Sequence, residues 1–348
     1  MNATDPKPAP INRRAGHRPE WLKIRVPGDL AQLPVSKLMN DLALNTVCQE
    51  ARCPNIFECW GAGTATFMIL GEICTRRCTF CAIGKGKPLA ADADEPRRVA
   101  EAVGKMGVRH AVITMVNRDD MPDGGAAHLA KTVIAVRDET GAAVEVLISD
   151  LEGNRDALSV VIASGPEVLA HNVETVPRLY PAVRPVATYK RSLDVLRWAS
   201  EERTVNMLTK SSLMLGLGET EDEVLAVARD LRDAGVDILT MGQYLAPTGN
   251  HHPVRRYYTP EEFAALGAKA KALGFHHVES APLVRSSYMA HRALVGKTAE
   301  FAAGQTLLSC AGAGEMGVRV SHVCGGDGAR GTCRVEIVDG WDSLSGED

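Results

Sequence analysis

Residues 65–81, which decide the fold, read ATFMILGEICTRRCTFC. The first six form an apolar run of strand length. This run leads at once into a loop with three cysteines, Cys74, Cys78 and Cys81, spaced C-x3-C-x2-C. Iron–sulfur clusters normally take four thiolates, so three thiolates would leave one iron of a [4Fe–4S] cluster open for chemistry. The stretch therefore predicts a strand that carries an iron–sulfur loop at its carboxyl end.

A second group of three cysteines lies just upstream. Cys48, Cys53 and Cys59 are spaced C-x4-C-x5-C. Zinc sites usually pair C-x2-C with a second such pair or with two histidines, and the sequence has neither arrangement here. Two three-thiolate sites side by side predict an enzyme in which one cluster starts a reaction and the other supplies something to it.

Composition limits the class of protein. The 348-residue chain has a formal net charge of −4 and lacks a long basic stripe, which argues against nucleic-acid binding. No apolar run approaches the roughly 20 residues that a membrane helix needs. The first ten residues lack the Arg-rich pattern of a transit peptide, and cysteines without a signal peptide indicate a reducing compartment. We therefore expect a cytoplasmic protein with no nucleic-acid or membrane partner.

The C-x3-C-x2-C loop resembles the signature of the radical SAM superfamily, whose open iron binds the amino and carboxylate groups of S-adenosylmethionine. Phe80, directly before the third cysteine, fits the aromatic residue which that superfamily favours. A longer likeness, over about residues 20–295, is to the lipoyl synthases. It is carried by NTVCQEARCPNIFECW (45–60), RDDMPDGG (118–125), HNVETVPRLY (171–180), MLGLGET (214–220) and RSSY (285–288).

This resemblance implies a sulfurtransferase reaction. Reduced [4Fe–4S] on Cys74, Cys78 and Cys81 would cleave S-adenosylmethionine to a 5′-deoxyadenosyl radical, which removes hydrogen from C6 of a protein-bound octanoyl chain. A second cofactor molecule repeats the step at C8. An auxiliary [4Fe–4S] cluster on Cys48, Cys53 and Cys59 would donate both sulfur atoms, with Ser287 as its fourth ligand and Ser286 as the alternative.

The resemblance also implies partners. The substrate would be an octanoylated lipoyl carrier domain, such as the E2 component of a 2-oxoacid dehydrogenase or the H protein of glycine cleavage. A ferredoxin- or flavodoxin-type reductant would supply electrons, and a cluster-repair protein would rebuild the auxiliary cluster.

Candidate residues for binding S-adenosylmethionine lie farther along the chain. Asn172 and Glu174 sit two apart on a candidate strand, so both would point to one face. Residues of this kind more often form a strand-end turn and a solvated carboxylate, but the resemblance implies binding to the ribose hydroxyls. It likewise implies that Gly216 and Gly218 bring backbone close to adenosine, and that Asn117, where the family usually carries Asp, lies near the methionine end. His251 and His252 are expected in a solvated loop without a function.

Strand-like and helix-like segments alternate from residue 65 to about 275. Candidate strands are residues 65–70, 110–116, 143–149, 167–173, 205–215 and 236–242. Helices are expected at 96–106 and 221–234, and capping boxes at Thr220-x-x-Glu223 and Thr259-x-x-Glu262. Six βα units indicate an α/β fold with a parallel sheet and outer helices, which fits the partial (β/α)6 barrel implied by the resemblance.

Three domains follow. Residues 1–60 would be an N-terminal extension with the auxiliary cysteines, 61–295 the partial barrel, and 300–348 a tail resembling the start of a [2Fe–2S] ferredoxin domain. Such domains use C-x5-C-x2-C and a distant fourth cysteine. In the tail, Cys324 and Cys333 fit the first and third positions, but Arg330 stands at the second, and Cys310 precedes the motif instead of following it. Two thiolates do not hold a stable [2Fe–2S] cluster, so the tail is interpreted as degenerate or truncated.

Three other functions stay open on sequence grounds. A radical SAM enzyme with another substrate would share the Cys74 loop but should lack the Cys48 group combined with Ser287. A catalytically impaired paralogue would bind the octanoylated carrier without turnover. A redox fusion that passes electrons through the tail is disfavoured by Arg330.

Overall fold

The computed structural model describes residues 19–23, 33–50, 53, 55, 56, 59, 66–288, 290, 318–321 and 334–337. The chain divides into two compact units, Met1–Ala290 and His291–Asp348. The predicted domain boundaries at residues 60 and 295–300 stay a prediction. Among the described residues, no helix combines the length and apolar character needed to cross a bilayer.

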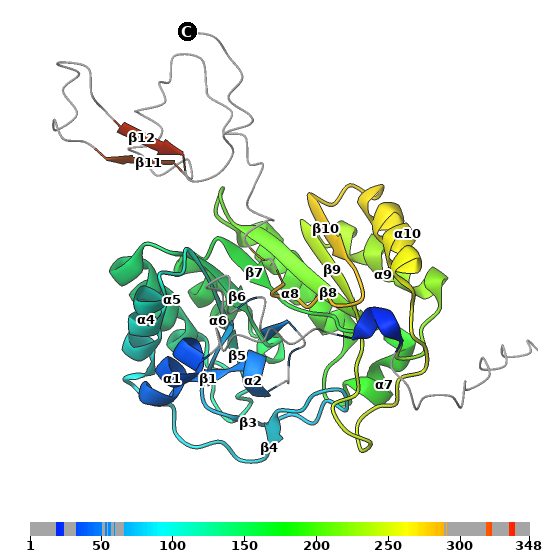
Figure 1. Ribbon diagram of the computed structural model, residues 1–348, viewed down its shortest axis with the longest axis horizontal. Coiled ribbons are helices and arrows are strands. Elements are labelled where there is room, and N and C mark those ends of the chain that lie inside the picture. Colours follow the sequence, from blue (N-terminus) through cyan, green and yellow to red (C-terminus); the bar gives the residue numbers. More distant parts are fainter. Residues whose placement is uncertain are drawn as a thin grey trace, which may run out of the picture. The chain divides into compact units, whose positions relative to one another are not determined.

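The first unit is built on an eight-stranded sheet that curves in an open arc (Figure 1). Seven strands run parallel in the order β2-β5-β6-β7-β8-β9-β10, and the short β1 pairs antiparallel with β2 at one edge. The strands are β1 (Asn45–Thr46), β2 (Thr66–Ile69), β5 (His110–Met115), β6 (Ala143–Leu147), β7 (Val168–Ala170), β8 (Leu208–Leu215), β9 (Ile238–Gln243) and β10 (His277–Ser280). The α/β partial barrel predicted from the sequence is thus confirmed.

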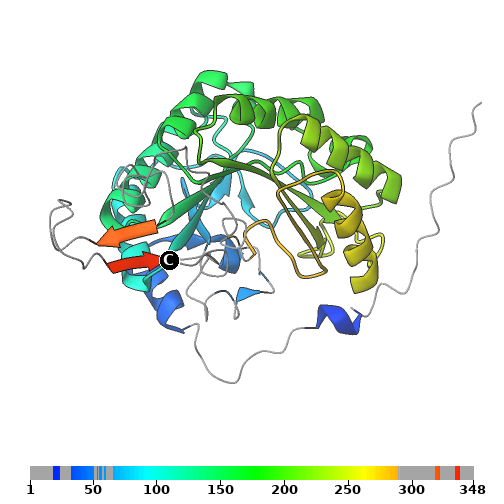
Figure 2. The same ribbon diagram turned by 90° about the horizontal axis from the view of Figure 1, so that it is seen from above.

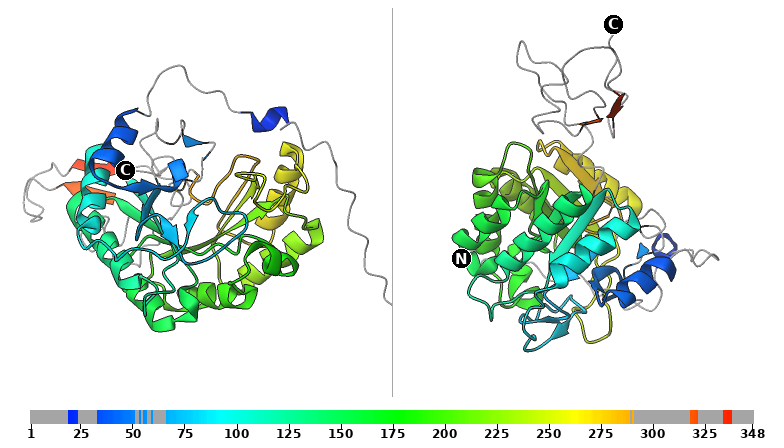
Figure 3. Two further views of the ribbon diagram at one scale, coloured as in Figure 1. Left: turned by 90° about the horizontal axis from the view of Figure 1, so that it is seen from below. Right: turned by 90° about the vertical axis from the view of Figure 1, so that its left-hand side faces the viewer.

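Helices cover the outer face of this sheet, whereas the strands line the inside of the arc (Figures 2 and 3). Each helix of this outer layer follows a strand along the chain. Shorter helical elements precede these helices or connect the strands to them. The outer helices are α4 (Glu95–Met106), α5 (Ala126–Thr140), α6 (Arg155–Ala163), α8 (Tyr189–Glu202), α9 (Glu221–Asp233) and α10 (Pro260–Lys271). The shorter elements are α1 (Leu33–Asp41), α2 (Val47–Glu50), α7 (Tyr180–Val183) and the 3-10 turns Glu20–Leu22, Leu151–Gly153 and Pro177–Leu179.

Both predicted capping boxes are present. The Thr220 side chain accepts a hydrogen bond from the backbone N–H of Glu223, and the Glu223 carboxylate accepts one from the N–H of Thr220. Thr259 and Glu262 make the same reciprocal pair at the start of α10. Each box satisfies two N–H groups that a helix start leaves without intrahelical partners, and this fixes where α9 and α10 begin.

The six predicted strands are confirmed, with two differences. Residues 167–173 do not form one continuous strand, because β7 ends at Ala170 and Glu174 takes a left-handed φ of 66°. The second difference is β10 (His277–Ser280), which the sequence pattern did not indicate. Its residues are all only partly buried, so they lack the alternation or apolar run that marks the other strands.

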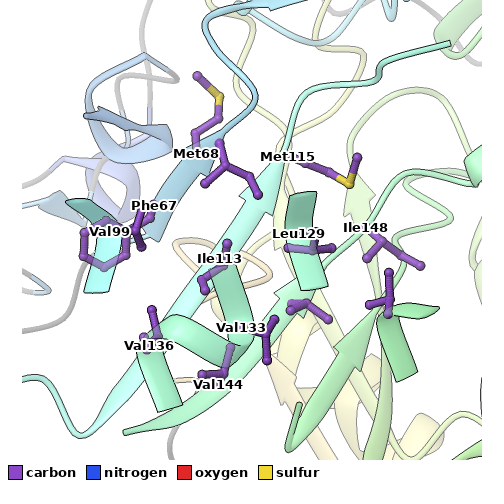
Figure 4. Packing of buried hydrophobic residues seen from close by; sticks show 14 of the residues in the cluster. Phe67, Met68, Val99, Ile113, Met115, Leu129, Val133, Val136, Val144 and Ile148 are labelled. Atoms are coloured by element: carbon purple, nitrogen blue, oxygen red, sulfur yellow. The ribbon is translucent and has the colours of Figure 1, made fainter. Parts of the chain in front are cut away.

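The hydrophobic core lies between the sheet and its outer helices (Figure 4). Phe67 of β2 and Ile113 of β5 pack against Val99 of α4 and Leu129 and Val133 of α5, all fully buried. Burying such a side chain contributes roughly 1.5–3 kcal/mol. This packing holds the carboxyl ends of β2 and β5 in fixed positions, and the candidate site begins at these ends.

The second unit contains an antiparallel pair, β11 (Val318–Ser321) and β12 (Arg334–Ile337). Both strands fall on segments that resemble a ferredoxin domain. The tail residues that decided the ligand count, Cys310, Cys324, Arg330 and Cys333, lie outside the described residues.

Candidate active site

The Cys74–Cys81 loop leaves the sheet through a tight turn at the end of β2. Leu70 and Gly71 take positive φ values of 69° and 90°. The Leu70 N–H donates to Glu95 Oε2 at 2.9 Å, and that carboxylate also lies 2.7 Å from His128 Nε2. A buried pair from α4 and α5 therefore holds the strained turn, and the turn fixes the direction in which the cysteine loop starts.

Arg76, inside the C-x3-C segment, braces the first half of this loop. Its guanidinium donates to both Asp119 oxygens at 2.8 and 2.9 Å and to Asp150 Oδ1 at 2.6 Å. Arg76 is 2% exposed and Asp150 is fully buried, so the two charges must compensate each other. The pair lowers the pKa of Asp150 to about 2 although burial alone would raise it. Because these aspartates follow β5 and β6, the loop is tied to two neighbouring strand ends.

The second half of the loop is tied to segments from the far side of the arc. The Thr79 N–H donates to Val183 O at 2.9 Å, and the His252 N–H donates to Thr79 O at 2.9 Å. His251 Nε2 lies 3.1 Å from Cys81 O, and His252 Nε2 lies 3.0 Å from Leu217 O. His251 and His252 do lie in a partly exposed loop as expected, but both rings also meet backbone carbonyl groups beside the site. Only tertiary structure brings them there, and no local sequence signal indicated it.

Burial acts on the acidity of two of the loop thiols. It raises the pKa of Cys78 above its usual range and that of Cys81 to about 11. Arg184 acts against this at Cys78, where its positive charge lowers the thiol pKa. Cysteines bind iron as thiolates, so cluster insertion at this loop must release protons.

Asn172 and Glu174 lie side by side beyond the end of β7, not on one face of a strand as predicted. The turn at Glu174 brings them together, and Asn172 Nδ2 donates to Glu174 Oε1 at 3.2 Å. Burial raises the pKa of Glu174 while Arg184 lowers it. Arg184 is itself buried and donates to the carbonyl oxygen of Asn172 at 2.9 Å.

Several buried polar atoms of this region have no partner in the described part of the chain. They include Asn117 Oδ1, Asn172 Oδ1 and Arg184 Nε. The backbone carbonyl oxygen of Asn117 accepts from Thr75 of the cysteine loop at 3.1 Å, so this residue also borders the loop. Buried polar atoms rarely stay unsatisfied. Unpaired acceptor and donor atoms beside Cys78 suit a polar ligand with hydroxyl, amino and carboxylate groups, as S-adenosylmethionine has.

The carboxylate of Glu219, for which the sequence predicted no role, shapes the Gly216–Gly218 turn. Glu219 accepts from the N–H groups of Gly216, Leu217 and Gly218 at 2.6, 2.9 and 3.0 Å. A side chain on Gly216, whose φ is 102°, would meet Arg256 O at 2.4 Å. These amides are therefore engaged within the protein, and the turn can offer a ligand close backbone contact but few free N–H donors.

A separate cavity brings the other three cysteines together. Its wall combines residues from both ends of the first unit. The lining residues are Cys48, Cys53, Asn55, Ile56, Cys59, Thr66, Arg285, Ser287 and Tyr288. Ser287 is thus beside the three thiols, whereas Ser286 does not line the cavity.

Hydrogen bonds between segments distant in sequence cross this cavity. Thr66 Oγ1 donates to Ser287 Oγ at 3.0 Å, and Asn55 Nδ2 donates to Leu283 O at 2.7 Å. Burial raises the pKa of Cys53, and the nearby Arg285 lowers it. Burial in turn lowers the pKa of Arg285, and the charge on Cys53 raises it.

These residues fit a cluster better than a single ion. Within the described ranges, no three His, Cys, Asp or Glu side chains converge as they would around one metal ion. A [4Fe–4S] cluster does not require such convergence, because each thiolate binds a different iron. Three thiols and one hydroxyl around a cavity match that demand at the Cys48 site, and three thiols with unpaired polar neighbours match it at the Cys74 site.

The chain is similar in sequence to lipoyl synthases of several bacteria. Residues 68–231 match the model of the radical SAM superfamily. A lipoyl synthase of Rubrobacter xylanophilus is 59% identical over 79% of this chain and 85% of its own length. Lipoyl synthases of Chloroflexus aurantiacus (52% identical, 84% of this chain, 94% of the relative) and Caldicellulosiruptor bescii (51%, 78% and 94%) are also similar.

Proposed function

Because this chain belongs to the lipoyl synthase family of the radical SAM superfamily, we propose that its two cysteine groups divide the reaction between them. The activity is sulfur insertion at C6 and C8 of a protein-bound octanoyl chain, with S-adenosylmethionine and [4Fe–4S] clusters as cofactors. The octanoyl chain arrives on a carrier protein. Extensive identity to lipoyl synthases disfavours both a different radical SAM substrate and an impaired paralogue.

Cys74, Cys78 and Cys81 would hold the cluster that binds S-adenosylmethionine. When bound, these groups supply an electron and a carbon–sulfur bond whose cleavage gives the radical that removes hydrogen from the substrate. The observation in support is the set of unpaired buried atoms on Asn117 and Asn172 beside this loop. We assign Asn172 and Glu174 to the ribose, Asn117 to the methionine end, and Gly216 and Gly218 to close backbone contact.

Cys48, Cys53, Cys59 and Ser287 would hold the auxiliary cluster, which is consumed as the sulfur-donating substrate. The single observation that carries this assignment is the cavity that all four residues line. A hydroxyl oxygen is a weaker iron ligand than a thiolate, so Ser287 can release its iron more easily than the cysteines can. Its hydrogen bond with Thr66 holds the Oγ atom at the cavity wall.

Two further partners are part of this proposal. A ferredoxin- or flavodoxin-type protein would deliver electrons to the Cys74 site. A cluster-repair protein would rebuild the auxiliary cluster, because two sulfur atoms leave the enzyme in each turnover. The carrier would be an E2 lipoyl domain or an H protein.

An anaerobic single-turnover assay tests the division of roles. Reconstituted protein would receive octanoyl-lysyl carrier domain, S-adenosylmethionine and dithionite, and the carrier would be weighed by mass spectrometry. We expect the carrier to gain the mass of two sulfur atoms, as two thiol groups that replace the hydrogens at C6 and C8, and Cys48→Ala to abolish this gain while 5′-deoxyadenosine still forms. Full sulfur insertion by Cys48→Ala would contradict the assignment of the auxiliary site.

A further inference from the structure

Arg285 is a cation in the wall of the auxiliary cavity that no carboxylate of the described residues balances. A hydrogen bond of its side chain runs from Nη1 to the neighbouring carbonyl oxygen, Val284 O, at 2.7 Å. None of the described acidic side chains forms an ion pair with it. In contrast, the buried Arg76 at the other site is matched by two aspartates.

A half-buried guanidinium without a counter-charge is costly, because it loses water without gaining a partner anion. Arg285 cannot turn away freely, since its segment is held at Gly242 of β9. A side chain on Gly242 would meet Val284 O at 2.0 Å, so the two backbones are in close contact there. The fold therefore keeps a positive charge at the cavity wall beside Cys53.

We propose that Arg285 is the counter-charge for the auxiliary cluster and that it positions and retains this cluster in its cavity. The inference rests on the proposed function, in which Cys48, Cys53 and Cys59 hold the cluster. Three thiolates, a hydroxyl ligand and the inorganic sulfides bring net negative charge into a space whose described wall contains no other cation. Guanidinium N–H groups suit such sulfur acceptors, and hydrogen bonds to cluster sulfur raise the reduction potential.

The inference makes opposite predictions for the empty and the loaded protein. Without a cluster, Arg285 is an uncompensated charge, so Arg285→Gln should leave the apo protein as stable or make it more stable. With a cluster, loss of the counter-charge should weaken retention, and removal of a group that supports metal ligands typically costs about 10–100-fold in affinity. A purely structural Arg285 would instead stabilise the apo protein through its bond to Val284 O.

The test uses the full chain with Cys74, Cys78 and Cys81 all replaced by Ala, so that only the auxiliary cluster can form. In this background, Arg285→Gln, Arg285→Lys and the control Arg97→Gln would be reconstituted with iron and sulfide. Arg97 lies on the exposed face of α4, paired with Asp94 and Glu101. Iron retention against a chelator, the cluster reduction potential and apo thermal unfolding would be measured.

We expect Arg285→Gln to lose iron about 10–100-fold faster and to have a lower reduction potential, without loss of apo stability. Arg285→Lys should retain the potential in large part because it retains the charge, and Arg97→Gln should match the parent. Equal iron retention in Arg285→Gln and the parent overturns the inference, and so does a destabilised apo protein. Absence of any cluster in the Arg285 parent would instead overturn the assignment of Cys48, Cys53 and Cys59, and the inference with it.

Discussion

The two cysteine sites of this chain are built in opposite ways. The Cys74 loop is short in sequence, and side chains from other elements hold it along its length. Glu95 accepts from the Leu70 N–H at its start, Asp119 and Asp150 pair with Arg76, and the His251 ring meets Cys81 O. The Cys48 site is assembled from segments more than 220 residues apart, and the two described hydrogen bonds across it are Thr66–Ser287 and Asn55–Leu283. In the proposed function the Cys74 site keeps its cluster and the Cys48 site gives up sulfur, and the different bracing of the described residues fits that division.

The largest expected effect separates the two sites by product. If Cys78 is a ligand of the cofactor-binding cluster as proposed, Cys78→Ala should reduce formation of 5′-deoxyadenosine to background. Cys53→Ala should retain that product but transfer no sulfur to the carrier. Chromatography of the nucleoside and mass spectrometry of the carrier read both outcomes. Loss of 5′-deoxyadenosine in Cys53→Ala as well, or its full retention in Cys78→Ala, would contradict the division between the sites.

The bracing of the Cys74 loop predicts a large stability effect. Arg76→Gln would leave the fully buried Asp150 carboxylate with the Glu152 N–H at 3.1 Å and, among the described cations, the more distant Arg191 at 3.3 Å. Breaking a buried pair by removing one partner typically costs 3–5 kcal/mol, and we expect about 3 kcal/mol in the free energy of unfolding of the apo protein. Arg97→Gln, at an exposed pair, should change it by less than about 1 kcal/mol. Equal denaturant midpoints for the two variants would contradict the bracing role.

Protonation of His171, next to Asn172, should lower the free energy of unfolding at acid pH. This side chain bonds to Ile148 O and Ser192 Oγ, and burial lowers its pKa to about 4. The unfolded chain binds a proton near pH 6.5, so between pH 6.5 and 4 the unfolded state holds more protons and stability falls as pH falls. From pH 7 to 4.5, His171 should account for about 2–3 kcal/mol of that loss.

His171→Gln keeps a donor and an acceptor but does not titrate, so it should flatten this part of the pH profile. Chemical unfolding of apo protein at several pH values measures the slope. A variant with the slope of the parent would show that His171 is already protonated in the folded state.

The smallest expected effect concerns the closure of the auxiliary site. Thr66→Val removes the hydrogen bond to Ser287 Oγ while keeping the shape of a buried side chain. A hydrogen bond of this kind contributes about 1 kcal/mol, so iron release from the auxiliary cluster should quicken about fivefold. Thr79→Val, which alters only the Cys74 loop, is the matched control. Faster iron release in Thr79→Val than in Thr66→Val would reverse the comparison.

Local sequence patterns predicted the parts of the molecule that depend on local order. The apolar runs located β2, β5, β6, β8 and β9, and the Thr-x-x-Glu pairs located two helix starts, because strand burial and capping act within a few residues. The two cysteine spacings likewise distinguished two sites, because each group of three cysteines lies within a short stretch of sequence. Ligand roles at Ser287, Asn172 and Glu174 remain proposals that draw on family resemblance.

Features set by distant contacts escaped prediction. His251 and His252 meet the Cys74 loop only because the barrel brings residues 170 positions apart together. The local sequence around Arg76 does not indicate that this side chain is buried. Its burial depends on Asp119 and Asp150, which follow β5 and β6 and pair with it. Glu219 lies inside a quoted motif, but its role depends on a backbone turn that folds three amides onto its carboxylate.

The most direct test of the account follows sulfur from the auxiliary site. Protein reconstituted with ³⁴S-labelled clusters would complete one anaerobic turnover with octanoyl-lysyl carrier in excess unlabelled sulfide, and iron would be counted afterwards. The account predicts that both sulfur atoms on the carrier carry the label and that one cluster is lost while the cluster at Cys74, Cys78 and Cys81 remains. Unlabelled sulfur on the carrier, or a full complement of iron after turnover, would contradict it.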